Sequence, residues 1–220
     1  MKEYSKIAKE LDIDVSKDEE ATRKAGRMMV AGDTAEEELE GAIKGHKTVV
    51  LGCAESLAKE LDGFISKNKL QKYSVIAADG AVSACLERKF VPDVNVTDLD
   101  GRLQDILTAH LMGCITVAHV HGDNIDRFSD VIPKLRKKLV VTTQVMPQKN
   151  IQNYYGFTDG DRAVAIARHF KAKSIKLIGF DFKGNVSKYS KQAFPFSHKP
   201  SERKLKKLRI ANRLIKQFLK

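Results

Sequence analysis

The sequence predicts an α/β protein: a mostly parallel, Rossmann-like sheet of about six strands flanked by helices, with a helical N-terminal segment. From Lys47 onward, short β-branched runs alternate with longer mixed segments, most of them long enough for a crossover helix, which is typical of repeated βαβ units. Most runs are apolar at nearly every residue, as expected of parallel strands that are covered on both faces. Strands are expected at Thr48 to Leu51, Ser74 to Ala77, Val94 to Thr97, Ile115 to Ala118, Leu139 to Thr142 and Ile175 to Ile178.

Residues 1–45 contain no strand-like run and are expected to form a helical segment that precedes an α/β domain at residues 46–220. The acidic run from Asp33 to Glu38 is typical of the first turn of a helix, because carboxylates are favourable near the positive end of the helix dipole.

The chain is expected to end in a basic amphipathic helix from Ser201, since apolar residues recur there at three- and four-residue steps. The apolar stripe is expected to dock on the sheet, and the Lys/Arg face to be solvated. Contacts from Lys199, Arg203 or Lys204 to a nucleotide triphosphate stay open. The stripe consists of Leu205, Leu208, Ala211, Ile215 and Phe218.

Composition favours a cytoplasmic protein. The 220 residues are 42% hydrophobic and 30% charged, which is ordinary for a soluble domain, and no apolar run approaches the length of a membrane span. Three cysteines without a Cys-x-x-Cys pair indicate neither a disulfide framework nor a zinc site. Most of the net charge of +11 comes from the C-terminal helix, so nucleic acid is not an expected partner.

Each predicted strand is followed by residues rich in Asp, His, Gln or Gly. Because the carboxyl ends of parallel strands meet at one edge of a sheet, these segments are expected to form a ligand site there. The segments are Gly52-Cys53-Ala54-Glu55-Ser56-Leu57, Asp79-Gly80, Asp98-Leu99-Asp100-Gly101, His119-Val120-His121-Gly122-Asp123-Asn124, Thr142-Thr143-Gln144 and Gly179-Phe180-Asp181.

Asp98 and Asp100 are the strongest candidates for a metal site. Residues i and i+2 of an extended backbone project to one side, so both carboxylates can reach one cation, with Asp79 at the preceding strand end. Mg²⁺ prefers oxygen ligands and usually binds together with substrate phosphates, which indicates an enzyme that handles phosphate groups. The alternative is an Asx-turn with solvated carboxylates.

Two other strand ends leave their chemistry open. The turn from Gly52 to Ser56 can present backbone N–H groups to an anion, although it lacks the Gly-Lys-Ser/Thr end of a P-loop and is otherwise a simple tight turn. His119, His121 and Asp123 can bind a transition metal, hydrogen-bond to substrate or phosphate, or serve structure alone. Hydrogen bonding to substrate is ranked above metal binding.

The segment from Gly156 to Ala163 precedes a predicted helix and carries two aspartates and an arginine, Asp159, Asp161 and Arg162. One aspartate can cap the helix, and two exceed what a cap requires. A second carboxylate could hold the amino and ring-nitrogen edge of a heterocycle. Capping alone and ligand binding both stay open.

Taken together, these motifs resemble those of the archaeal 6-hydroxymethyl-7,8-dihydropterin diphosphokinases, relatives of thiamine diphosphokinase. The resemblance runs from about Val49 to Ser190. It departs from the family at Ala54 and Glu55, which stand where the family has a second glycine and a proline. The resembling elements are Ala78 to Ala81, Pro92-Asp93, Thr97 to Gly101, His119 to Asn124, Thr142 to Gln144, Gly156 to Arg162 and Gly179 to Asp181.

The resemblance implies ATP and Mg²⁺ as cofactors and transfer of the β,γ-diphosphate of ATP to the hydroxymethyl group of the pterin. AMP is released, and the product serves pterin synthesis of the tetrahydromethanopterin or folate type. It implies catalytic roles for Asp98, Asp100, Asp123 and His121, with metal binding by Asp98, Asp100 and Asp79. It implies ATP binding by Gly52, Ser56, Asp79, Gly80, Thr142 and Gln144, and substrate binding by Asn124, Asp159, Asp161, Arg162 and Asp181.

Three alternatives remain. A thiamine diphosphokinase would use the same phosphate chemistry on another acceptor, and a nucleotide-sugar transferase would use Asp-x-Asp to hold a cation against a sugar diphosphate. A non-catalytic protein could bind nucleic acid through the basic tail, although no basic patch interleaved with aromatic residues supports it. The oligomeric state, including a homo-oligomer, stays open.

Overall fold

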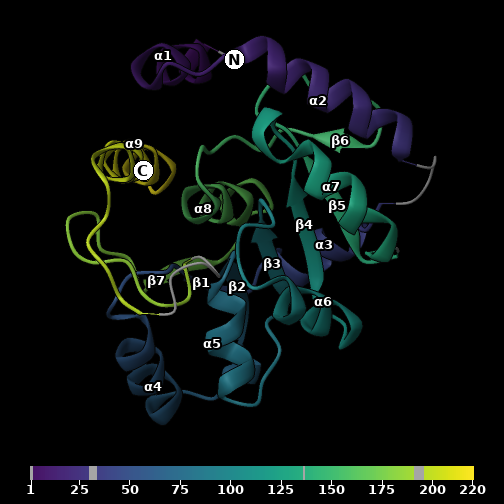
Figure 1. The fold of residues 1–220 in the computed structure, drawn as a ribbon. Coiled ribbons are helices and arrows are strands. Elements are labelled where there is room, and N and C mark those ends of the chain that lie inside the picture. The colour runs from purple at the N-terminus through teal and green to yellow at the C-terminus, as the bar shows by residue number, and fades with distance from the viewer. Residues whose placement is uncertain (1, 30–33, 136, 191–195) are drawn as a thin grey trace.

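The computed structural model describes residues 2–29, 34–135, 137–190 and 196–220 (Figure 1). Seven strands form one sheet in the order β6-β5-β4-β3-β2-β1-β7, and every neighbouring pair is parallel. The strands are β1 (Lys47–Leu51), β2 (Tyr73–Ala78), β3 (Val94–Thr97), β4 (Ile115–His119), β5 (Leu139–Thr142), β6 (Ile151–Gln152) and β7 (Ser174–Ile178).

The six predicted strands are confirmed, each to within one residue at either end. The prediction missed β6, which lies at the edge of the sheet and has only two residues. A strand this short cannot show an apolar run or an alternating pattern, so local sequence carries no signal for it. It exists because Ile151 and Gln152 pair with Val141 and Thr142 of β5.

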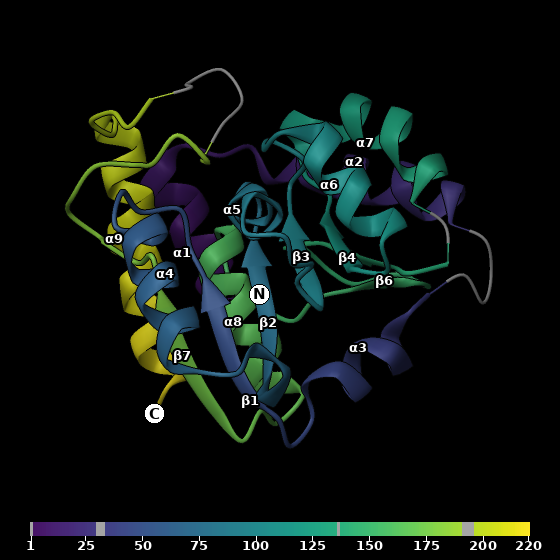
Figure 2. The same ribbon diagram turned by 90° about the horizontal axis from the view of Figure 1, so that it is seen from below.

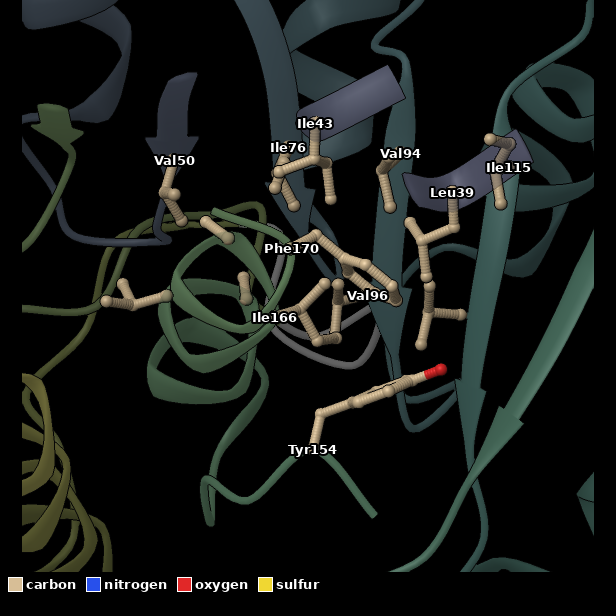
Figure 3. Close-up of a cluster of buried hydrophobic side chains, with 14 of the residues drawn as sticks. Leu39, Ile43, Val50, Ile76, Val94, Val96, Ile115, Tyr154, Ile166 and Phe170 are labelled. Atoms are coloured by element: carbon tan, nitrogen blue, oxygen red, sulfur yellow. The ribbon is translucent and has the colours of Figure 1, made fainter. Parts of the chain in front are cut away.

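Helices cover both faces of the sheet, which explains the apolar character of its strands. On one face Val49 and Leu51 of β1 pack with Leu57 and Leu61 of α4. On the other face Val50 packs in a cluster with side chains of α3 and α8 (Figure 3). Figure 2 shows α4 and α5 in front of the sheet and α8 behind it. The helices around the sheet are α3 (Glu36–Ile43), α4 (Leu57–Lys67), α5 (Ala81–Glu87), α6 (Leu103–Leu111), α7 (Ile125–Val131) and α8 (Asp159–His169), with 3₁₀ turns at Leu70–Lys72, Gly122–Asn124 and Ile132–Lys134.

The side of the sheet on which the chain adds its next strand changes at β1. Strands β1 to β6 are laid down side by side in chain order, and then the chain returns through α8 to place β7 on the free side of β1. This change makes the carboxyl edge at β1 the switch point of the sheet. Ligand sites of open α/β sheets form at such a switch point.

The N-terminal segment is helical, as predicted, over its described residues. It forms α1 (Lys2–Leu11), α2 (Val15–Met28) and α3, while Asp33 lies outside the described residues. Asp14 caps α2 by accepting a hydrogen bond from the Ser16 amide at 3.0 Å. Helix α1 packs next to the C-terminal helix, and α2 packs against α7 (Figure 1). Among the described helices, none combines the length and apolar character that crossing a membrane would require.

The predicted C-terminal helix is confirmed as α9 (Glu202–Phe218), and the Ser201 side chain caps it by accepting from the Lys204 amide at 3.2 Å. Its docking partner differs from the prediction. Its buried residues face mainly α8 and α1 instead of the sheet, because α8 already covers that part of the sheet (Figure 1).

The segment after β7 folds back across the carboxyl edge. The Ser187 amide donates to the Cys53 carbonyl at 3.0 Å, and a Cβ atom on Gly80 would lie 1.6 Å from the Tyr189 carbonyl oxygen. The backbones of the two loops are thus in contact, and only glycine fits at position 80.

This contact predicts opposite effects for two glycine substitutions. Gly80→Ala should lower the free energy of unfolding by about 1–3 kcal/mol, because the new methyl group meets backbone that cannot move aside. Gly63→Ala should raise it by about 0.5–1 kcal/mol, because Gly63 lies inside α4 with no atom near its Cβ position and alanine is the better helix former. Urea unfolding of both variants measures the change. Equal free energies of unfolding for the two variants would contradict the close backbone contact at Gly80.

Candidate active site

A pocket opens at the carboxyl ends of β1, β2, β3 and β7, at the switch point of the sheet. The start of α8 and one side of α9 complete its wall. Part of the wall is acidic, with Asp79, Asp98, Asp100, Asp159 and Asp181, and part is apolar, with Phe180, Phe182, Leu208 and Ala211. The Lys204 side chain also lines it.

Three of these carboxylates form a close group. One oxygen from each of Asp79, Asp98 and Asp159 lies within 4.8 Å of the others. The three residues follow β2, follow β3 and begin α8, so only the folded chain brings them together. A set of carboxylate oxygens suits a hard cation such as Mg²⁺. The sequence predicted Asp98 with Asp79 and Asp100, whereas the structure groups the first two with Asp159.

Asp79 is held in a fixed orientation. Its backbone is left-handed, with φ of 45°, and its Oδ1 accepts from the Thr97 hydroxyl at 2.6 Å and the Gly101 amide at 3.0 Å. Burial, together with the nearby charge of Asp98, raises the pKa of Asp79 to about 7. This carboxyl therefore carries a proton part of the time near neutral pH.

The pKa values of the other two carboxyl groups, Asp98 and Asp159, are shifted in opposite directions. Burial opposes the ionisation of Asp98, but the His121 imidazole, with Nε2 3.9 Å from Asp98 Oδ2, together with the Asp100 amide and Arg162, holds the pKa of Asp98 below its usual range. Burial and the charge of Asp98 raise the pKa of Asp159 well above its usual range, even though Arg162 lies 2.9 Å away. Asp98 thus keeps its charge while its two neighbours resist ionisation.

The turn after β4 fixes the backbone of Asp98. The Asn124 side chain donates to the carbonyls of Asp98 and His119, both at 2.8 Å, and accepts from the His121 amide at 2.9 Å. Nδ1 of His121 accepts from the Asp123 amide at 3.2 Å, which places the ring proton on Nε2, toward Asp98. Asn124 thus joins two loops, and Asp123 is exposed.

The start of α8 shows which aspartate caps the helix. Thr158 and Asp161 form a capping box, and the buried Asp161 carboxylate accepts from the Phe157 amide at 2.6 Å and the Thr158 amide at 2.8 Å. Asp159 is left to face the other carboxylates, paired with Arg162. Arg162 also donates to the Phe157 carbonyl at 3.1 Å, which fixes its guanidinium.

The turn after β1 is tied to the segment after β7. The Ala54 amide donates to the Gly179 carbonyl at 2.9 Å, and the Glu55 amide donates to the Asn185 carbonyl at 3.1 Å. These two amides are therefore already engaged and would have to break those bonds to bind an anion. Gly52 lines the pocket and Ser56 does not.

The structure places the remaining predicted residues as follows. Thr142 and Gln144 lie outside the pocket lining, where Thr142 Oγ1 contacts His119 Nδ1 at 3.1 Å and Gln144 donates to Asp18 at 2.9 Å. Asp181 lines the pocket and also closes its own turn by accepting from the amides of Lys183 and Gly184. His119 and His121 each use Nδ1 for a protein contact, and the cation-ligand group found among the described residues includes neither.

No local pattern in the sequence singles out Phe182, Asn185 or Asp18. The first two lie in a loop whose crossing over the β1 turn depends on distant contacts. Asp18 stands beside Lys17, Glu19 and Glu20, a local pattern typical of a solvated helix face, yet its side chain is buried.

Comparison with known proteins identifies relatives of the whole chain. The family model described as 6-hydroxymethylpterin diphosphokinase MptE-like matches residues 26–186. A Pyrococcus furiosus protein named 6-hydroxymethyl-7,8-dihydropterin pyrophosphokinase is 39% identical, over 96% of this chain and 89% of its own length. A Methanocaldococcus jannaschii protein of the same name is 35% identical, over 96% of this chain and 91% of its own length.

The acidic residues that line the pocket all lie inside the matched range, whereas Lys204 lies outside it. The family match covers well over half of the chain, and the two relatives cover nearly all of it. The chain therefore belongs to the 6-hydroxymethylpterin diphosphokinase MptE-like family.

Proposed function

We propose that this protein is a 6-hydroxymethyl-7,8-dihydropterin diphosphokinase. It transfers the β,γ-diphosphate of ATP to the hydroxymethyl oxygen of the pterin and releases AMP, in pterin synthesis of the tetrahydromethanopterin or folate type. The observation that carries the proposal is the group of Asp79, Asp98 and Asp159 in a pocket at the switch point of the sheet. The names of its relatives support the same acceptor.

The acidic group fits Mg²⁺, because its ligand atoms are carboxylate oxygens from three separate elements and their mutual repulsion is relieved by a cation. Asp79, Asp98 and Asp159 would hold the ion, with Asp100 beside them on the pocket wall. When bound, Mg²⁺ neutralises charge on the phosphate oxygens.

The protein's own task is alignment. The hydroxymethyl oxygen attacks the β-phosphorus and loses its proton to solvent, the bond from that phosphorus to the α-phosphate oxygen breaks, and AMP leaves with the electron pair of that bond. Such transfers depend on positioning and on charge stabilisation more than on a strong base. The apolar wall of Phe180, Phe182 and Leu208 suits a flat ring, and the acidic wall suits the metal-bound phosphates.

The resemblance leaves either Asp123 or His121 to orient the attacking hydroxyl. We assign this part to His121, because its Nε2 lies 3.9 Å from Asp98 Oδ2 while the Asp123 side chain is exposed, although neither residue is part of the pocket lining. Asn124 and Asp161 keep the loops of the site in place, since their polar atoms bond to backbone groups.

The decisive experiment measures AMP release from ATP and Mg²⁺, with 6-hydroxymethyl-7,8-dihydropterin and thiamine tested in parallel. AMP is expected with the pterin alone. Asp98→Ala should abolish it, whereas Asp126→Ala, which removes an exposed carboxylate of α7, should leave it unchanged. Near-normal AMP release by folded Asp98→Ala would contradict the metal assignment.

The alternatives give other results in the same assay. AMP formed only with thiamine would keep the chemistry and change the acceptor. Release of UDP or CMP from a nucleotide sugar, without AMP from ATP, would indicate a sugar transferase. Salt-sensitive nucleic-acid binding that is lost when residues after Lys199 are removed would indicate the binding protein.

Lys204 is predicted to bind the polyphosphate of ATP, because it is the lysine that lines the pocket beside the carboxylates, among the described residues. Lys204→Met should raise the KM for ATP roughly tenfold to a hundredfold, the range expected when a charge-assisted hydrogen bond is lost. The exposed Lys206, two residues along the same helix, provides the control Lys206→Met with unchanged KM. Equal KM values for the two variants would refute the contact.

The raised pKa of Asp79 predicts that the stability of the metal-free protein depends on pH. This pKa is raised in the folded state to about 7, so the stability that Asp79 contributes is present below its unfolded pKa of 3.8 and is lost as pH rises through 7. Asp79→Asn, which keeps an oxygen for Thr97 and Gly101, should therefore be more stable than wild type at pH 8 and not at pH 4. Urea unfolding with a chelator at both pH values measures this, and Mg²⁺ should reduce the difference at pH 8.

A further inference from the structure

We infer that Asp18 of the N-terminal segment is a positioning residue of the active site. Its carboxylate fixes the turn after β4, and that turn holds His121 and Asn124 against Asp98. The inference rests on the proposed function only in taking Asp98 as a cation ligand. It assigns residues near the start of the chain, outside the range of the family match, to the catalytic unit.

Asp18 accepts hydrogen bonds from three different parts of the fold. It is 3% exposed and lies on α2. The Gly122 backbone amide donates to Oδ1 of Asp18 at 2.7 Å, and the side-chain amide of Gln144 donates to Oδ2 at 2.9 Å. The Tyr4 hydroxyl of α1 also donates to Oδ2. A buried carboxylate with three donors is strongly held, and its donors are held in return.

Close packing makes this link stiff. A Cβ atom on Gly122 would lie 2.6 Å from the Cβ of Lys17, so α2 approaches the turn as closely as glycine permits. One turn further along α2, the Thr22 hydroxyl contacts the Thr143 hydroxyl at 2.7 Å. Helix α2 is therefore fixed to the carboxyl ends of β4 and β5 at two places.

The link continues from Gly122 to Asp98 through the two neighbouring residues. His121, directly before Gly122, places Nε2 3.9 Å from Asp98 Oδ2. Asn124, two residues after it, donates to the Asp98 carbonyl at 2.8 Å. Loss of the Asp18 carboxylate would leave the Gly122 amide without its acceptor and free both contacts to shift. Groups that orient metal ligands typically change metal affinity by about 10–100-fold when removed.

The test compares Mn²⁺ binding, followed by electron paramagnetic resonance, for wild type and Asp18→Ala. Mn²⁺ serves as the probe because it binds carboxylate oxygens as Mg²⁺ does. Asp18→Ala is expected to weaken Mn²⁺ binding at least fivefold. Asp18→Asn is expected to stay within twofold of wild type, because its amide oxygen can still accept from the Gly122 amide.

Two control variants separate positioning from general destabilisation. Tyr4→Phe removes a donor to the same carboxylate but leaves the Gly122 bond, so it should lower the unfolding temperature and keep Mn²⁺ affinity within twofold of wild type. Glu19→Gln removes the exposed carboxylate next to Asp18 and should change neither. If Asp18→Ala does not fold, Gly122→Ala disrupts the same contact from the other side and should show the fivefold loss.

A loss below fivefold in the folded test variant would overturn the inference, as would an equal loss in Tyr4→Phe or the absence of Mn²⁺ binding by wild type. The result is independent of the acceptor, because binding is measured without turnover. A fivefold loss in a protein that releases no AMP would keep the positioning role and reject the diphosphokinase proposal.

Discussion

Repulsion among carboxylates is the constraint that organises this molecule. One carboxylate oxygen from each of Asp79, Asp98 and Asp159 lies within 4.8 Å of the others, where burial and the charge of Asp98 oppose the ionisation of Asp79 and Asp159. Each is therefore fixed by dedicated partners: Asp79 by Thr97 and Gly101, Asp98 by the Asp100 amide and His121, and Asp159 by Arg162. The surrounding fold supplies the rigidity that keeps these groups together in the absence of a cation.

The sheet topology brings these groups to one place. Because every strand is parallel, all carboxyl ends lie on one edge, and because β7 returns to the side of β1, the pocket is lined from the ends of β1, β2, β3 and β7. The helices that start or pass at this edge add what strands cannot supply, which is Asp159 from α8 and Lys204 from α9. The acidic and apolar walls of the pocket thus come from segments far apart in the chain.

Local sequence was sufficient where a residue's role follows from its own element. Six of the strands were predictable from their apolar runs, and Asp79 and Asp98 from their places after two of those runs. Local sequence was insufficient where contacts between distant parts of the chain set a residue's role. The two-residue β6 could not be deduced, because its pairing with β5 creates it. Nor could local sequence show that Asp161 caps α8 while Asp159 faces the other carboxylates, because the hydrogen bond between Thr158 and Asp161 decides this. Asp18 was missed for the same reason, since its donors come from Tyr4, Gly122 and Gln144.

The return of the chain to β1 also sets the order in which a growing polypeptide can acquire its structure. Until β7 is synthesised, β1 has a partner on one side alone, and it presents an unpaired edge to other chains. Most of the sheet can form on the ribosome before that point, whereas the pocket cannot close until the last helix has emerged. A nascent chain therefore contains Asp79, Asp98 and Asp159 before it contains β7 and α9, the segments that complete the pocket wall.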